Sequence, residues 1–253
     1  NKSGGICGPA HDSHESAGRK GGESVTGNIV GTVIGLGLMF GVPVAAGGFY
    51  LWKRDGSIWI FLAGVLSFSV SQLLLRLPFL QYAGTNWDWF MLLPYTNRVL
   101  YYGILGLTAG LFEETARLLA FELVKRKKKF LDWRDGLALG LGHGGVEAVW
   151  IAVTGLMAAG SSVFSSGSGL FFGGVERLFA MTLHLGFSFL IEKEVMEKRM
   201  RWWILAVVLH GLVDFQLVIR NMVIVECLLA VEAVAVWVLL LLGYIRKKVA
   251  AEI

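Results

Sequence analysis

About seven apolar stretches dominate the chain, and each is long enough to cross a hydrocarbon core of about 30 Å. They lie at residues 28–51, 57–80, 98–124, 135–159, 169–191, 202–219 and 222–245. Only 17% of the residues are charged, whereas soluble domains carry about 25%. Many of the 33 glycines fall inside the apolar stretches, as is typical of closely packed membrane helices. The sequence therefore predicts an all-α fold, a polytopic transmembrane helical bundle of about seven helices.

Basic residues follow alternate stretches, which predicts the topology. Lys53 and Arg54 follow the first stretch, residues 125–129 (KRKKK) follow the third, and further clusters follow the fifth and the last. Because cytoplasmic connections are enriched in Lys and Arg, we expect the N-terminus outside and the C-terminus in the cytoplasm of a multi-pass protein of the cell membrane. The net charge of +4 then reflects topology and contact with the lipid bilayer, and no nucleic-acid partner is expected.

The first 27 residues differ from the rest of the chain. They are rich in Gly, Ser and charge, so we expect a disordered polar tail (1–27) before a transmembrane helical domain (28–253). His11 and His14 are most simply part of this solvated tail. Two cysteines, Cys7 and Cys227, exclude a disulfide framework.

The third apolar stretch carries two glutamates and an arginine at its middle. Glu113 and Arg117 are four residues apart, and Glu114 and Arg117 are three apart. Either carboxylate can therefore pair with the guanidinium on one helix face, which leaves the other carboxylate over. We expect one glutamate to orient the ion pair and the other to be free for acid–base chemistry.

Three further stretches each present one histidine. His143 and Glu147 are four apart, His184 lies two turns after an arginine, and His210 and Asp214 are four apart. Counted at about 1.5 Å per residue from the cytoplasmic helix ends, the two glutamates and the three histidines all lie roughly 10 to 18 Å deep. Hydrogen bonds that serve packing alone would explain one such histidine, but a layer of five such residues favours a functional site.

Small residues flank this layer. Gly136, Gly140 and Gly144 recur every four residues beside His143, so we expect another helix to pack closely there. Glu226 and Glu232 in the last stretch have no intramembrane histidine or arginine beside them, and a structural or pore-lining role suits them as well.

The motifs occur in the order EExxR, GHGGxEA, ER followed by a histidine, and HGxxD. This order resembles the YhfC-type intramembrane metalloproteases. It is similar, more distantly, to the CAAX-prenyl-protease and bacteriocin-processing group, to PrsW and to the Aph-1 scaffold of gamma-secretase. The resemblance extends from Glu113 to Asp214 and, with the flanking helices, covers most of the chain beyond the tail.

The resemblance implies an intramembrane endopeptidase that acts on a membrane protein or peptide substrate. It implies these site residues: the paired glutamates Glu113 and Glu114 with Arg117 as partner, a second-motif histidine at His143 or His184, and a final motif at His210 and Asp214. Glu147 is an addition to the pattern, and the sequence leaves open which of the two middle histidines acts.

Two mechanisms fit these residues. In one, His143, His184 and His210, with one of the two glutamates, hold Zn²⁺ and leave a position for water. In the other, a glutamate and His143 polarise water directly, while His210, held by Asp214, donates to the oxyanion. The chain lacks HExxH, which slightly favours metal-free chemistry. It also lacks GxSxG and a Ser–Lys pair in the layer, which disfavours a serine protease.

Two other classes of function remain as alternatives. A non-catalytic scaffold subunit resembling Aph-1 would use the polar layer to hold the bundle together. An ion- or proton-coupled transporter would use it to relay charge, but we expect internal repeats in such a protein and find none. The sequence does not indicate the oligomeric state.

Overall fold

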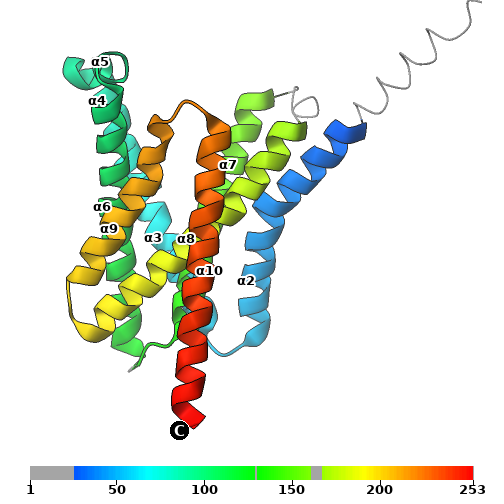
Figure 1. Ribbon diagram of the computed structural model, residues 1–253, viewed down its shortest axis with the longest axis vertical. Coiled ribbons are helices and arrows are strands. Elements are labelled where there is room, and N and C mark those ends of the chain that lie inside the picture. The colour runs from blue at the N-terminus through cyan, green and yellow to red at the C-terminus, as the bar shows by residue number, and fades with distance from the viewer. Residues whose placement is uncertain (1–25, 129, 161–166, 253) are drawn as a thin grey trace, which may run out of the picture.

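In a computed structural model, residues 26–128, 130–160 and 167–252 are described, and all of their regular structure is helical (Figure 1). The predicted all-α fold is confirmed. The polar tail, with His11 and His14, lies outside the described residues except for its last two positions.

Within the described residues, six continuous helical segments are long and apolar enough to cross a membrane. The first is Thr26–Lys53, with a π-helical segment η1 (Gly37–Gly41) before α2 (Val42–Lys53). The second is Ser57–Asn86, in which α3 (Ser57–Phe68), the π-helical η2 (Ser69–Arg76) and α4 (Leu77–Asn86) run on continuously. The others are α7 (Trp133–Ala159), α8 (Gly167–Glu197), α9 (Arg201–Phe215) with η4 (Gln216–Val218), and α10 (Met222–Glu252).

Helix α6 (Arg98–Lys127) would be the seventh span. It has 30 residues, which corresponds to roughly 45 Å and exceeds the thickness of a hydrocarbon core. Its central charges, Glu113, Glu114 and Arg117, are buried inside the bundle. The count of seven spans remains a prediction.

The segment between α4 and α6 is itself helical. Residues 88–96 form the short helix α5 (Asp88–Thr96). Phe90 and Leu93 of α5 are buried in a cluster with Ala83 of α4. This burial supplies an apolar core that stabilises so short a helix.

Glycines let several helices approach to backbone contact. A Cβ on Gly64 of α3 would overlap the backbone of Leu139 in α7, and one on Gly142 of α7 would overlap that of Phe61 in α3. The predicted glycine stripe on α7 faces α8, as expected. A Cβ on Gly144, for example, would lie 3.1 Å from His184.

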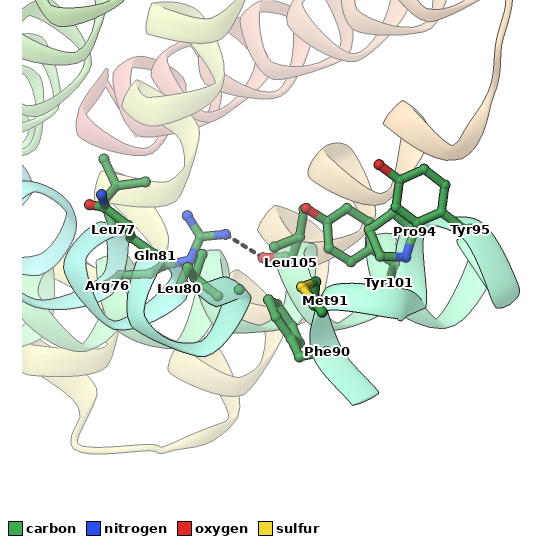
Figure 2. Close-up of a pocket in the computed structure, with 11 residues that line it drawn as sticks. Arg76, Leu77, Leu80, Gln81, Phe90, Met91, Pro94, Tyr95, Tyr101 and Leu105 are labelled. Atoms are coloured by element: carbon green, nitrogen blue, oxygen red, sulfur yellow. Dashed lines mark hydrogen bonds between the residues drawn. The ribbon is translucent and has the colours of Figure 1, made fainter. Parts of the chain in front are cut away.

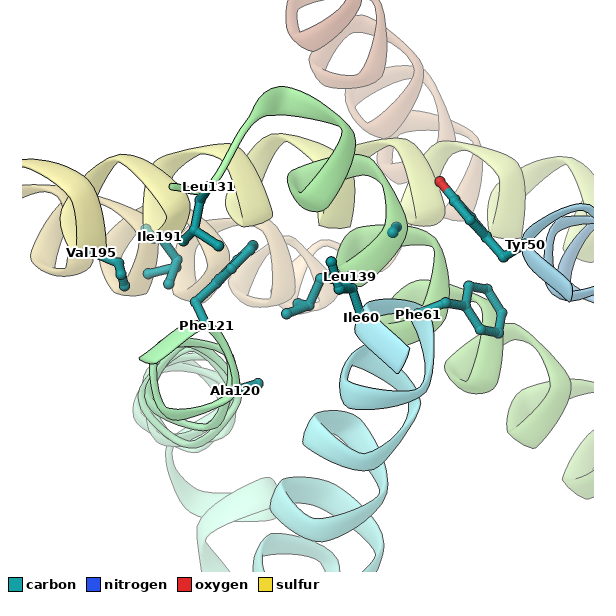
Figure 3. Close-up of a cluster of buried hydrophobic side chains, with 11 residues drawn as sticks. Tyr50, Ile60, Phe61, Ala120, Phe121, Leu131, Leu139, Ile191 and Val195 are labelled. Carbon is teal, nitrogen blue, oxygen red and sulfur yellow. The ribbon is translucent and has the colours of Figure 1, made fainter. Parts of the chain in front are cut away.

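The main apolar cluster lies toward the end where α6 turns into α7. Tyr50, Phe61, Phe121, Leu139 and Ile191 are among its members, and they come from α2, α3, α6, α7 and α8 (Figure 3). Ala206 of α9 also belongs to it. Because one cluster joins six helices, it fixes the positions from which each helix extends toward the polar layer.

The basic connections lie at one end of the bundle. The turns after α2, α6 and α8, and the C-terminal end of α10, meet at the lower end of Figure 1, whereas α5 lies at the opposite end. This grouping agrees with the predicted alternation of charge. That the basic end faces the cytoplasm remains a prediction.

Candidate active site

The bundle gathers the predicted polar residues into one buried layer. Glu114, Arg117 and His143 are fully buried, and Glu113, His184 and His210 are nearly so. The ring centroids of His143 and His184 are 5.0 Å apart, and those of His184 and His210 are 5.5 Å apart. Helices α6, α7, α8 and α9 thus bring their buried charged and imidazole side chains together, as the sequence predicted.

Glu113 and His143 form one of the carboxylate–imidazole pairs in the layer. Glu113 Oε2 lies 2.9 Å from His143 Nε2. On the other side of the ring, His143 Nδ1 lies 2.7 Å from Ser67 Oγ, and that hydroxyl donates to the carbonyl of Gly64 at 2.8 Å. Since a hydroxyl has one proton, Nδ1 must donate to Ser67. Nε2 therefore faces the carboxylate, and a proton is shared between them.

The other oxygen of Glu113 is held from η2, the π-helical continuation of α3. Gln72 donates to Glu113 Oε1, and Arg76 Nη1 donates to Gln72 Oε1 at 2.9 Å. The sequence reasoning missed Ser67, Gln72 and Arg76. Arg76 could have been found, because it is the one charged residue inside the second apolar stretch. Ser67 and Gln72 give no such signal.

Arg76 also borders a cavity of about 550 Å³ on the side of α5. Its Nη2 donates to the carbonyl of Leu105 at 2.6 Å, beside Phe90 and Tyr101 (Figure 2). Within the described residues, no carboxylate oxygen lies within 4.0 Å of the guanidinium. Its nearest acidic neighbour along the hydrogen bonds is therefore Glu113, reached through Gln72.

Glu114 has strongly ionic surroundings. Its Oε1 forms an ion pair with Arg117 Nη1 and lies 2.7 Å from His210 Nδ1. This corrects the expectation that Asp214 holds His210. Asp214 is half-buried and makes no hydrogen bond to other described residues. A carboxylate on the neighbouring helix α6 takes the position that the spacing of four residues suggested for Asp214.

His184 is held from both sides. Arg117 Nη2 lies 3.0 Å from His184 Nδ1. A guanidinium can only donate, so Nδ1 accepts and the ring proton is on Nε2. Nε2 in turn contacts Glu147, which pairs with Arg177 Nη1 at 2.7 Å. Glu147 and Arg177 thus belong to the layer through His184.

The donor set fits a metal ion only in part. One potential ligand atom from each of Glu113, His143 and His184 lies within 4.8 Å of the others. His143 is ready, because Ser67 fixes its proton on Nδ1 and leaves Nε2 as a ligand. His210 is ready in the same way, through Glu114. His184 must give up its Nε2 proton or release Arg117 before that nitrogen can bind a metal.

Comparison with known proteins agrees with the resemblance noted in the sequence. A family model described as YhfC intramembrane metalloprotease matches residues 38–171 and 165–235. A protein of Bacillus subtilis (strain 168), described as the uncharacterized membrane protein YhfC, is 29% identical over an alignment of 233 residues, and the match covers 78% of this chain and 86% of the relative. No solved structure matches the chain.

Proposed function

The chain belongs to the YhfC intramembrane metalloprotease family and is a multi-pass integral membrane protein, and we propose that it is an endopeptidase of the cell membrane. Its substrates would be membrane proteins or peptides. The observation that carries the proposal is the buried contact of 2.9 Å between Glu113 Oε2 and His143 Nε2. A carboxylate and an imidazole that share one proton can take a proton from water and return it later.

The geometry suggests a catalytic role for each of these residues. The Glu113–His143 pair removes a proton from a water molecule as its oxygen attacks the scissile carbonyl carbon. The carbon–nitrogen bond then breaks, and the pair returns the proton to the leaving amine. His210 Nε2 lies 3.7 Å from Glu113 Oε2, so a proton on this nitrogen can stabilise the oxyanion.

Glu114, Arg117 and Glu147 hold the imidazoles in place. Glu114 fixes His210, and Arg117 and Glu147 fix His184 from opposite sides. We give these three residues positioning roles, because their contacts go to other protein groups.

A Zn²⁺ ion would fit the same residues. Glu113 and His143 would hold it once the proton that they share is displaced, and His184 would join after losing its Nε2 proton. His210 would be a ligand only without a proton on Nε2. A bound Zn²⁺ would supply an acidified water and a Lewis acid. The metal content of the purified protein, compared with that of His143→Ala, distinguishes the two forms of the site.

Two orphaned atoms support catalysis over a scaffold role. Among the described residues, Glu114 Oε2 and Arg117 Nε are buried without a hydrogen-bond partner. A layer that served packing alone should satisfy such atoms, since leaving them unpaired is costly. Their presence fits a site that takes up water or substrate.

The test compares the N-termini of membrane proteins in cells that make the native chain or Glu113→Gln. We expect new termini only with the native chain. Glu226→Gln is the matched control, since it removes an intramembrane glutamate outside the layer and should leave the termini unchanged. Identical sets of termini at equal levels of folded protein would overturn the proposal and favour a scaffold subunit.

A further inference from the structure

A groove of about 950 Å³ runs between α3 and α6, and nothing above assigns it a role. Its walls are apolar and open toward the lipid: Trp59 and Leu66 on α3, and Leu119 and Leu123 on α6, are each more than half exposed. In a membrane protein such side chains face the hydrocarbon. The groove is therefore accessible sideways from the bilayer.

Small side chains leave room along the inner side of the groove. Ala63 of α3, and Ala116 and Ala120 of α6, line it there. Larger residues at these positions would fill the space between the helices. The separation of α3 and α6 at this level thus depends on alanines on both sides.

The groove leads to the candidate active site. Its lining includes Ser67, whose hydroxyl accepts from His143 Nδ1, and Ala116, which lies between the paired glutamates and Arg117 on α6. From Ser57 at the rim to Ser67 the helix rises over ten residues, or about 15 Å. The groove therefore joins the basic end and the lipid, and it ends at Ser67, one side chain from the buried layer.

The rim at the basic end carries charges of both signs. Lys53 pairs with Asp55 at 2.6 Å, and Lys128 pairs with Asp135 at 2.7 Å, while Lys127 also lines the rim. The hydrogen bond from Lys53 lowers the pKa of Asp55. Partial burial acts to lower the pKa of Lys128, but its hydrogen bonds to Asp135 outweigh this effect and raise it. Asp55 and Lys128 therefore stay charged near neutral pH, and the charged rim suits the polar flank of a segment leaving the membrane.

We propose that this groove admits a membrane-embedded segment of the substrate sideways from the lipid and delivers it to Glu113 and His143. The inference rests on the proposed function and specifies the substrate class: a protein whose cleaved bond lies within its own membrane span. The depth of Ser67 also predicts where in its span the substrate is cleaved. New termini should fall inside predicted spans, about ten residues from the end on the basic side, because a helical segment rises about 1.5 Å per residue.

The test blocks the groove reversibly. Leu119→Cys is made with both native cysteines replaced by serine, and a bulky methanethiosulfonate reagent is attached through a disulfide bond. Leu107→Cys is the matched control, since Leu107 is on the same helix with an almost equal exposure, 58% against 59%, and lies outside the groove lining. The substrate is a membrane protein that acquires new termini with the native chain.

The proposal requires that the label on residue 119 lower the cleavage rate at least tenfold and that a reductant restore it. The label on residue 107 should have no effect. Restoration by reductant excludes misfolding as the cause, and Leu123→Cys provides a second attachment point if Leu119→Cys does not fold. Equal cleavage rates for the two labelled proteins would overturn the proposal that the substrate enters through the groove. A lipid chain would then be the occupant of the groove. If the native chain produces no new termini, the proposed function fails first and the groove proposal falls with it.

Discussion

The adjacent residues Glu113 and Glu114 occupy contrasting surroundings. Glu114 is fully buried and is fixed by Arg117 and His210. Glu113 contacts His143 and Gln72, and within the described residues no arginine or lysine nitrogen lies within 4.0 Å of its carboxylate. One glutamate is tied into an ion pair, while the other shares a proton with an imidazole.

This contrast teaches how two carboxylates side by side can have separate tasks. Consecutive residues on a helix point about 100° apart, so Glu114 faces α9 while Glu113 faces η2 and α7. A fixed ion pair stabilises the arrangement of the helices. A carboxylate held only by neutral groups and an imidazole can change its protonation during a reaction.

The largest effect is expected from Glu113→Gln. The new amide can accept from Gln72 and donate to His143 Nε2, so the hydrogen bonds and the fold should survive. Cleavage should fall by about 10² to 10⁴-fold, the usual contribution of general acid–base catalysis. The cleavage rate and the melting temperature in one detergent check this, and a variant that retained more than a tenth of the native rate would contradict it.

Glu114→Gln should lower the stability of the bundle, because it removes the carboxylate that pairs with Arg117. It leaves Arg117 buried without its carboxylate, and removing one partner of a buried ion pair costs about 3–5 kcal/mol. We expect a clearly lower melting temperature than for Glu113→Gln, with loss of cleavage as a consequence. Equal melting temperatures for the two variants would mean that the ion pair does not stabilise the bundle.

Ser67→Ala sharpens the assignment of the shared proton. Without the hydroxyl, His143 Nδ1 loses its acceptor, and the ring no longer favours the form that presents Nε2 to Glu113. We expect cleavage to fall about tenfold, as when other groups that orient an imidazole are removed. Ser71→Ala is the control, because Ser71 is also buried in the same continuous helical segment but donates only to the carbonyl of Phe68. An equal loss in both variants would assign the effect to packing.

The sequence predicted the parts of this site that follow from one helix at a time. Apolar length predicted the long helices, and the spacings of three and four residues predicted that one of the two glutamates pairs with Arg117. The sequence could not say which glutamate is left over, because that depends on which helices pack against each side of α6. Ser67 and Gln72 are neutral and common in membrane helices, so only their position in space reveals their contacts.

Asp214→Asn should have the smallest effect, and it tests the one partner that spacing assigned wrongly. A carboxylate four residues from His210 was the natural candidate, but Glu114 from α6 lies 2.7 Å from His210 Nδ1. Because Asp214 is near His210 but makes no hydrogen bond to other described residues, we expect the cleavage rate to change by less than about twofold. The rate is measured beside that of His210→Gln, which should lose most of its activity. If Asp214→Asn loses as much as His210→Gln, Asp214 orients the imidazole during catalysis, and the division of tasks between Glu113 and Glu114 must be extended to a third carboxylate.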